Sequence, residues 1–389
     1  MSINTAENIE ESQTKKLKEI AVSCLKLGTI GFGGIAGMVS TIENEMVIRR
    51  KWIDHQHFMD VLSTSYIIPG PNAVEVVMHC GKERGGRLGL VVAGICYLLP
   101  ATLICLLFGY FYKRYSALPD VQRFIFGVRP ATTALVVSTV FRLAGSTLKN
   151  NKTLILLCCL VFAAALYGMN EVLLIMGAGV VNYFAHSAKG RLPIVTGMFL
   201  APTFLEINSK FSNGKLFLVF LKIGAVLYGS GYVLFAYMDE ALVRNNHWLT
   251  HQQLMDAIAV GQITPGPILS SATFAGYLIQ GTTGGILTTI GIFLPSFFIS
   301  FFLHRILSSA RKSRKLRLFL DGLSAASVSI IAVVGFHLFT SSVQEWQGAV
   351  ILVLCLGLTF FWKRLNTVVV LLIGSAGGFL LLSMTSLIR

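Results

Sequence analysis

Charged residues are scarce in this chain. They make up 13% of its 389 residues, whereas a soluble protein carries about a quarter. Hydrophobic residues account for 54%, and apolar stretches such as Leu88–Tyr112 and Leu316–Phe339 approach the roughly 20 residues that a helix needs to cross a bilayer. These stretches do not alternate apolar and polar residues as the strands of a membrane barrel do. The composition therefore predicts an all-α polytopic membrane protein.

The sequence also lacks the motifs of several chemistries. It has neither the HExxH pattern of a metalloprotease nor the GxxxxGK[ST] loop of a nucleotide-driven pump. Its seven cysteines lie in or beside apolar stretches without a CxxC spacing, and its histidines show no metal-ligand spacing. We therefore expect no enzymatic activity, no cofactor and no metal site. The first nineteen residues mix Glu and Lys, so no cleaved signal peptide is expected.

The net charge of +14 does not indicate a nucleic-acid partner. Basic residues cluster between apolar stretches, as in "ARKSRKLR" (310–317) and "WKR" (362–364). That placement is typical of the cytoplasmic loops of membrane proteins, and short loops leave little soluble surface for a nucleic acid. We expect the lipid bilayer, and no nucleic acid, around this chain.

The two halves of the chain are copies of each other at an offset of 196 residues. The sequence Pro69-Gly70-Pro71 falls on Pro265-Gly266-Pro267 without a gap. The other matched pairs include Lys26/Lys222, Gly28/Gly224, Gly33/Gly229, Trp52/Trp248, His55/His251, Asp60/Asp256, Gly85/Gly281 and Gly89/Gly285, and Pro100 meets Pro295 after a slip of one. We predict a polar tail over residues 1–19, repeats over 20–186 and 215–389, and a linker over 187–214.

Loop charges predict that the repeats cross the membrane in opposite directions. The loop "GKERGGR" after the first PGP sequence is basic, whereas "QGTTGG" after the second is neutral and the next loop, "RILSSARKSRKLR", is strongly basic. One loop, 113–123, opposes this pattern because it is basic on the side expected to be external. We predict two inverted-topology repeats with about ten transmembrane helices, and we leave the side of the N-terminus open.

Each PGP motif interrupts an apolar segment. Proline removes a helical hydrogen bond and pushes the preceding residue out of helical geometry, so we predict a broken or re-entrant helix at each motif. Pro71 and Pro267 suit the first position of the new half-helix. The amides that follow lack helical partners, and a helix N-terminus favours anions. Facing broken helices are typical of transporters, while a kink that serves packing alone is the alternative.

The residues around these motifs resemble the chromate ion transporters of bacteria, in the long-chain form with two fused halves. The first half carries "KLGTIGFGG" (26–34), "ENEMVIRRKW" (43–52), "IIPGPN" (67–72) and "ERGGRLG" (83–89). The second half carries "FLKIGAVLYGSGYVLFAYMDEALV" (220–243), "HWLTHQQLMDAIAVGQITPGPILSSATFAGY" (247–277) and "GIFLPSF" (291–297). The resemblance implies a secondary transporter of the bacterial cytoplasmic (inner) membrane that exports chromate, and with it chromate resistance.

Small and polar residues near the motifs are the candidates for the substrate site. Lys26 and Lys222 could together neutralise a dianion or instead snorkel to the interface, and the glycines permit either ligand approach or close packing. The uncharged polar groups suit oxyanion oxygens. The predicted substrate-binding residues are Lys26, Gly33, Gly34, Pro69, Gly70, Pro71, Asn72, Lys222, Gly229, Gln262, Thr264, Pro265, Gly266, Pro267, Ser270 and Ser271.

Glu75 stands apart because a carboxylate one turn after the first motif opposes anion binding unless it carries a proton. We predict that it carries a coupling proton or gates the site, with a solvated charge in a vestibule as the alternative. Its counterpart at the 196-residue offset is Ser271. Asp60 and Asp256 are expected to act as caps or face the interface, and Arg129 is a weaker candidate for the cavity.

Other functions remain open at this point. A transporter of sulfate or another tetrahedral oxyanion would use the same donors, and an oxyanion channel would show conductance without coupling. The sequence leaves the transport direction, the coupling ion and the oligomeric state open, a homodimer being one option.

Overall fold

The computed structural model describes residues 3–31, 34–66, 69–148, 151–186, 212–228, 231–302, 313–362 and 365–388, and every regular element in them is helical. Gly33, Gly229 and residues 187–211 of the predicted linker lie outside these ranges.

The same order of elements occurs twice. The first repeat contains α1 (Ile3–Ile30), α2 (Gly34–Glu43), the π-helical turn η1 (Asn44–Arg49), α3 (His55–Ser65), α4 (Asn72–Tyr115), α5 (Pro119–Leu148), α6 (Lys152–Leu166) and α7 (Glu171–His186). The second contains α9 (Asn213–Val226), α10 (Val233–Met238), the π-helical turn η3 (Asp239–Asn245), α11 (His251–Ile263), the 3₁₀ turn η4 (Ile268–Ser270), α12 (Ser271–Phe302), α14 (Arg314–Ser342), α15 (Trp346–Phe361) and α16 (Thr367–Ile388).

Local geometry is duplicated as well as helix order. Lys51 and His247, which match at the 196-residue offset, both have a φ of +52°, a value that is uncommon outside glycine. The histidines that begin α3 and α11 also behave alike. His55 Nδ1 lies 2.7 Å from Glu43 Oε1, and His251 Nδ1 lies 3.1 Å from Asp239 Oδ1. Each of these histidines thus pairs with a carboxylate of its own repeat.

The long helix after each PGP motif folds back on itself. In α4 the chain reverses at Gly85 and Gly86, where Gly86 has a φ of +66°. A Cβ placed on Gly94 would lie 2.9 Å from Met78 Cγ, so the two limbs of α4 are antiparallel. In α12 the same reversal occurs at Gln280 and Gly281, with a φ of +63° at Gly281. Such values suit glycine because it has no Cβ.

The chain reversals at Gly86 and Gly281 correct the alignment of the two repeats. Gly86 and Gly281 share one conformation, and the tight glycine contact of Gly81 is repeated at Gly276, so the offset here is 195. The predicted pairs Gly85/Gly281 and Gly89/Gly285 are therefore wrong by one residue. The slip lies just after the PGP motif, where the second repeat has the 3₁₀ turn η4, because a 3₁₀ turn uses fewer residues than an α-helical turn.

Several elements are long and apolar enough to cross a membrane. They are Asn72–Tyr115, Pro119–Leu148, Ile268–Phe302, Arg314–Ser342 and Thr367–Thr385, and the shorter helices α6, α7 and α15 are apolar too. These helices confirm the expected class, a helical membrane protein. The number of crossings, about ten, stays a prediction.

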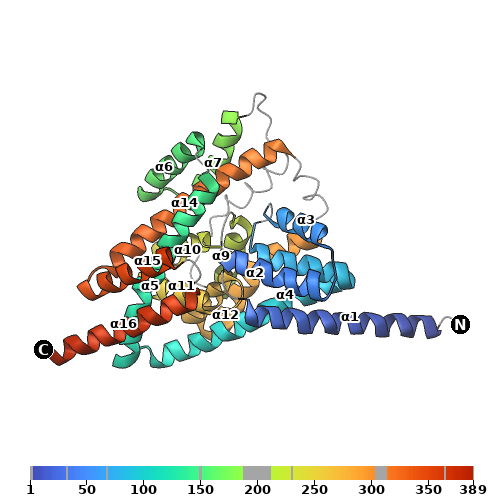
Figure 1. Ribbon diagram of the computed structural model, residues 1–389, viewed down its shortest axis with the longest axis horizontal. Coiled ribbons are helices and arrows are strands. Elements are labelled where there is room, and N and C mark those ends of the chain that lie inside the picture. The colour runs from blue at the N-terminus through green and yellow to red at the C-terminus, as the bar shows by residue number, and fades with distance from the viewer. Residues whose placement is uncertain are drawn as a thin grey trace.

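The repeats are interlocked in space. Helix α5 of the first repeat packs against α15 and α16 of the second, whereas α14 of the second packs against α6 and α7 of the first. Figure 1 shows α14 running beside α7, with α4 and α12 meeting near the centre. The exchange of α5 and α14 makes one continuous helical body from two sequence repeats.

Candidate functional site

Each PGP motif is bound to the other repeat. The Gly70 amide donates to Leu227 O at 2.8 Å, and the Gly266 amide donates to Gly31 O at 2.8 Å. Leu227 and Gly31 directly follow α9 and α1 at matching positions. Because α4 and α12 also pack against each other, the two motifs lie on either side of the contact between the repeats.

Glycine is required at the centre of both motifs. Gly70 has a φ of +131° and Gly266 a φ of +101°, conformations that L side chains rarely adopt. Space is also short, since a Cβ on Gly70 would overlap Ser296 Oγ and one on Gly266 would lie 3.2 Å from Ala101 Cβ. Ser296 and Ala101 occupy matching positions, each directly after the proline within its long helix.

The predicted helix breaks are present. Helix α3 ends at Ser65 and α4 begins at Asn72, while α11 ends at Ile263 and η4 begins at Ile268. Pro71 and Pro267 are extended N-cap residues, one position before the first helical position where we had placed them. Neither cap supplies a side-chain hydrogen bond, so the first amides of each half-helix point at the motif without a side-chain partner.

The second motif is lined by neutral donors. Gln262 Nε2 and Ser270 Oγ are buried, at 8% and 1% residue exposure, and neither makes a hydrogen bond of good geometry with the described residues. The thiol of Cys105 lies beside Ser270. Thr264 and Ser271 differ, because their hydroxyls donate to Val260 O at 2.7 Å and Ile268 O at 2.9 Å. Of these four side chains, Gln262 and Ser270 are the two whose donors remain available to a ligand in this conformation.

The first motif carries an acid instead. Glu75 is 3% exposed, and neither of its carboxylate oxygens has a hydrogen-bond partner in the described part of the chain. Ser296 lies beside the carboxyl, but not in good hydrogen-bonding geometry. The second repeat has serines, Ser270 and Ser271, at this level. Asn72 at the head of α4 is half-buried.

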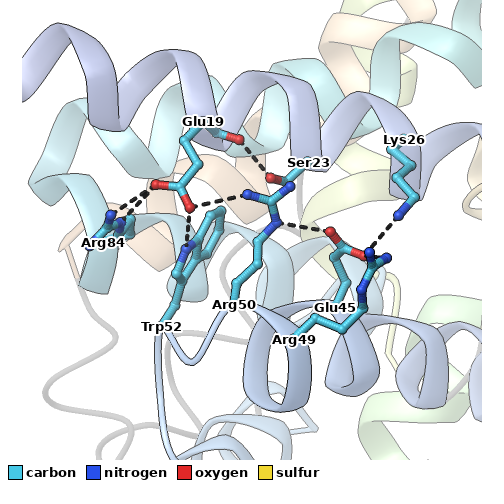
Figure 2. Close-up of polar contacts among 8 residues, drawn as sticks. All are labelled: Glu19, Ser23, Lys26, Glu45, Arg49, Arg50, Trp52 and Arg84. Carbon is cyan, nitrogen blue, oxygen red and sulfur yellow. Dashed lines mark hydrogen bonds and ion pairs between the residues drawn. The ribbon is translucent and has the colours of Figure 1, made fainter.

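Lys26 belongs to an ionic network between α1, η1 and α4. Its Nζ lies 3.0 Å from Glu45 Oε2, and Glu45 also accepts from Arg49 at 3.0 Å and Arg50 at 2.8 Å. Figure 2 shows that Arg50 continues to Glu19, which in turn accepts from Arg84 at 2.9 Å. Lys26 therefore has a carboxylate partner, and its role in anion binding stays a prediction. Lys222 is near enough to Glu240 to attract it electrostatically.

The network holds Glu45 in its charged form. Burial acts to raise the pKa of Glu45, but hydrogen bonds from Arg50 and Lys26 and the charges of Lys26 and Arg49 outweigh it and lower this pKa below its ordinary value. The pKa of Glu19 is lowered in the same way, against burial, by Arg84, Trp52 and Arg50. Through these ion pairs and hydrogen bonds, Glu19 and Glu45 connect α1 to η1 and α4.

Glu45→Gln is expected to lower the free energy of unfolding by about 2 kcal/mol at neutral pH, since hydrogen bonds to charged groups are lost. Because the pKa is lowered on folding, the wild-type advantage is complete above the unfolded value of 4.5 and is lost as the pH falls through the folded value. Thermal unfolding in detergent at neutral and acidic pH measures this. Glu43→Gln, which removes an exposed pair with His55, should cost less than about 1 kcal/mol. Equal losses of unfolding free energy at both pH values would contradict a charged Glu45 in the folded protein.

A second ionic group joins the repeats beside a cleft. Asp256 on α11 is 4% exposed and accepts from Arg129 Nε at 3.0 Å, Arg129 Nη2 at 3.1 Å and Tyr112 Oη at 2.6 Å. A cleft of about 780 Å³ opens over this group, lined also by Gln122, Arg123 and Gln253. Asp256, expected to cap or face the interface, is instead a buried ion-pair partner. Arg129 does line a cavity, as its weaker candidacy suggested.

The sequence missed a third cluster, formed by His57, His79 and Glu83. Their ligand atoms all lie within 4.8 Å of one another, although the chain order shows no metal-ligand spacing. The one signal available was the four-residue step from His79 to Glu83, which places both on one face of α4.

Comparison with known proteins identifies the family. The family model for chromate transporters matches residues 18–183 and again residues 214–379. The chain belongs to the chromate transporter family. It is 25% identical to a chromate transport protein of Cupriavidus metallidurans over 93% of this chain and 92% of that protein. It is 28% identical to a chromate transport protein of Pseudomonas aeruginosa over 92% of this chain and 90% of that protein, and 28% identical to a probable chromate transport protein of Synechococcus elongatus over 81% and 83%. No solved structure matches the chain.

Family membership confirms the resemblance read from the motifs. The two matched segments begin and end at the 196-residue offset found within the sequence, so each repeat is one family unit. The family consists of transporters, and the described helices fit a membrane transporter of this kind.

Proposed function

We propose that this chain is a secondary active transporter that exports chromate, or another tetrahedral dianion such as sulfate, across the bacterial cytoplasmic membrane. The observation that carries this function is a pair of buried donors, Gln262 Nε2 and Ser270 Oγ, on either side of Pro265-Gly266-Pro267 in the sequence. Neither makes a hydrogen bond of good geometry in the described part of the chain. Donors left unpaired in a protein interior cost free energy, and an oxyanion that accepts from both would remove that cost. Chromate is favoured over other oxyanions by the names of the relatives.

Each motif has a different role in this proposal. The second motif binds the anion with Gln262, Ser270 and the first amides of η4. The first motif supplies Glu75, whose burial without an ionic partner disfavours its charged form. A proton on Glu75 and an anion at the second motif are therefore compatible, whereas a charged Glu75 would repel the anion. This opposition is the means of coupling anion movement to a proton gradient.

Reciprocal contacts support inverted repeats. The first motif contacts the end of α9 as the second contacts the end of α1, and α5 and α14 are exchanged in the same reciprocal way. Such contacts require a twofold relation between the repeats. An axis in the membrane plane inverts them, and alternating access then follows from rocking one repeat against the other.

Uptake of radiolabelled chromate into inverted membrane vesicles tests the function. We expect saturable uptake that requires the proton gradient and persists in excess sulfate. Uptake that sulfate removes equally would reassign the substrate to the wider class of dianions. Conductance that continues after the gradient is collapsed would indicate a channel, and absence of any oxyanion flux would overturn the proposal.

Glu75→Gln is expected to abolish the dependence of chromate uptake on the pH gradient, because glutamine keeps the shape of the protonated acid but cannot release a proton. Anion binding should survive, since the donors at the second motif are unchanged. Glu345→Gln, which removes an exposed acid at the start of α15, serves as the control and should leave uptake unchanged. Normal uptake with normal pH dependence in Glu75→Gln would rule out the coupling role.

A further inference from the structure

A compact group of side chains of the types that can bind metal ions lies between α3 and the first limb of α4. His79 Nε2 lies 3.3 Å from Glu83 Oε1, and His57 Nε2 lies 3.7 Å from the same oxygen. The centroids of the two imidazole rings lie 5.6 Å apart, and the ring planes are tilted by 46°. His57 Nε2 is enclosed by protein and has no hydrogen-bond partner in the described part of the chain. All three ligand atoms therefore converge on one small volume.

These separations match those of a coordination shell. Two atoms bound to one tetrahedral Zn²⁺ at about 2.1 Å lie roughly 3.4 Å apart, and the two measured separations to Glu83 are 3.3 and 3.7 Å. His79 is 7% exposed at its side chain and is fixed on α4, whereas His57 and Glu83 are 44% and 40% exposed and have freedom to close the site. All three ligand atoms lie within 4.8 Å of one another.

The fold does not need these residues for packing. In the second repeat the matching positions hold Gln253, Phe274 and Leu278, and Phe274 and Leu278 are buried at 0% and 8% exposure. The same helix pair is thus built with an apolar contact where the first repeat has a histidine and an acid. Polar ligands at a position that tolerates apolar packing indicate a role in binding.

The surroundings leave room for the remaining ligands of an ion. A cleft of about 680 Å³ adjoins the cluster and is lined by Lys51, Trp52, Asp54, His57 and Glu83. Asp54 caps α3 by accepting from the His57 amide at 2.8 Å, which fixes the backbone of His57. Water from the cleft can fill the fourth position, as in open zinc sites.

We propose that His57, His79 and Glu83 form a binding site for a divalent transition-metal ion, with Zn²⁺ as the best match. Two imidazoles and one carboxylate suit Zn²⁺ and its neighbours in the first transition row, rather than Mg²⁺ or Ca²⁺, which prefer all-oxygen ligands. The bound ion joins α3 to α4, the two helices on either side of the first PGP motif, and stabilises that hairpin.

The test uses the full chain without an affinity tag, purified in detergent and freed of metal. Equilibrium dialysis against Zn²⁺ at neutral pH should show one site in the wild type, and Zn²⁺ should raise the unfolding temperature. His57→Ala and Glu83→Gln should each weaken binding at least 10-fold and remove the temperature shift. His55→Ala replaces a neighbouring exposed histidine that is paired with Glu43 and should bind Zn²⁺ as the wild type does.

His57 and Glu83 are partly exposed, so these variants are expected to fold, and chromate uptake provides an independent check that they do. Wild-type affinity in both His57→Ala and Glu83→Gln would place the ion elsewhere, for instance on cysteines, and would overturn the proposal. Failure of the wild type to bind Zn²⁺ would overturn it as well. Neither result depends on which anion the protein transports.

Discussion

Gly70→Ala is expected to reduce chromate uptake about 100-fold, the loss that follows when a binding group is displaced by about 1 Å. The added Cβ would overlap Ser296 Oγ, and the φ of +131° is itself unfavourable for alanine. The overlap must be relieved by moving the motif or α12. Since the Gly70 amide also holds Leu227 O, either movement disturbs the contact between the repeats. Uptake into vesicles, normalised to folded transporter, measures the loss.

Three further variants separate the effect of steric overlap from the effect of backbone strain. Ser296→Ala added to Gly70→Ala removes the overlapping oxygen and should restore part of the uptake. Gly86→Ala, at a φ of +66° with nothing within 4 Å of its Cβ, tests strain alone and should cost about 1–2 kcal/mol of stability with little change in uptake per folded molecule. Gly145→Ala, with open space and no positive φ, should be neutral or slightly stabilising. Equal uptake in Gly70→Ala and Gly145→Ala would remove the motif from the site.

Asp256→Asn is expected to lower the free energy of unfolding by about 3 kcal/mol, because removing one member of a buried ion pair leaves the other charge uncompensated. Arg129 would lose both of its hydrogen bonds to the carboxylate, at 3.0 and 3.1 Å, in a position where its side chain is 22% exposed. Arg129→Gln should cost a similar amount, since the carboxylate of Asp256 is 5% exposed. Chemical unfolding of the purified protein measures both.

The double variant shows whether the pair also serves transport. Arg129→Gln with Asp256→Asn should recover most of the stability, because neither charge is then left unpaired. Uptake should stay low if Arg129 draws the anion from the cleft toward Gln262. Gln262 lies six residues after Asp256 on α11, roughly 9 Å along the helix axis. Arg123→Gln, which breaks an exposed pair with Asp120 at the same cleft, should change stability by less than about 1 kcal/mol. Additive losses in the double variant would contradict the pairing.

Several features of the fold could be predicted because they depend on the local sequence pattern. Scarce charge and apolar stretches indicate membrane helices, and a proline on each side of Gly70 or Gly266 indicates a broken helix wherever it occurs. The duplication was visible in the spacing of glycines, tryptophans and prolines. The sequence comparison placed the change of offset from 196 to 195 at Pro100 and Pro295, later than the structure does. A 3₁₀ turn has no sequence pattern that distinguishes it from the start of an α-helix.

The candidate site was predicted less completely. The sequence singled out the polar residues near the PGP motifs but could not tell which of them keep donors for a ligand. Thr264 and Ser271 bond to their own backbone, whereas Gln262 and Ser270 do not. That difference depends on side-chain rotamers. Lys26 was found, but its partner Glu45 was not. The pair of Arg129 and Asp256 spans 127 residues and belongs to different repeats, so no local pattern could join them.

The sequence by itself determined the class of the protein, its duplication, the place of the helix breaks and its family, because each depends on residue type and spacing along the chain. The tertiary structure alone decided how the repeats interlock, which donors remain unpaired, and which charges meet. It brought His57, His79 and Glu83 together and set Gly70 against Ser296, contacts that arise only when α3, α4 and α12 pack side by side. Helix propensity acts over a few residues, whereas these contacts follow from the path of the whole chain.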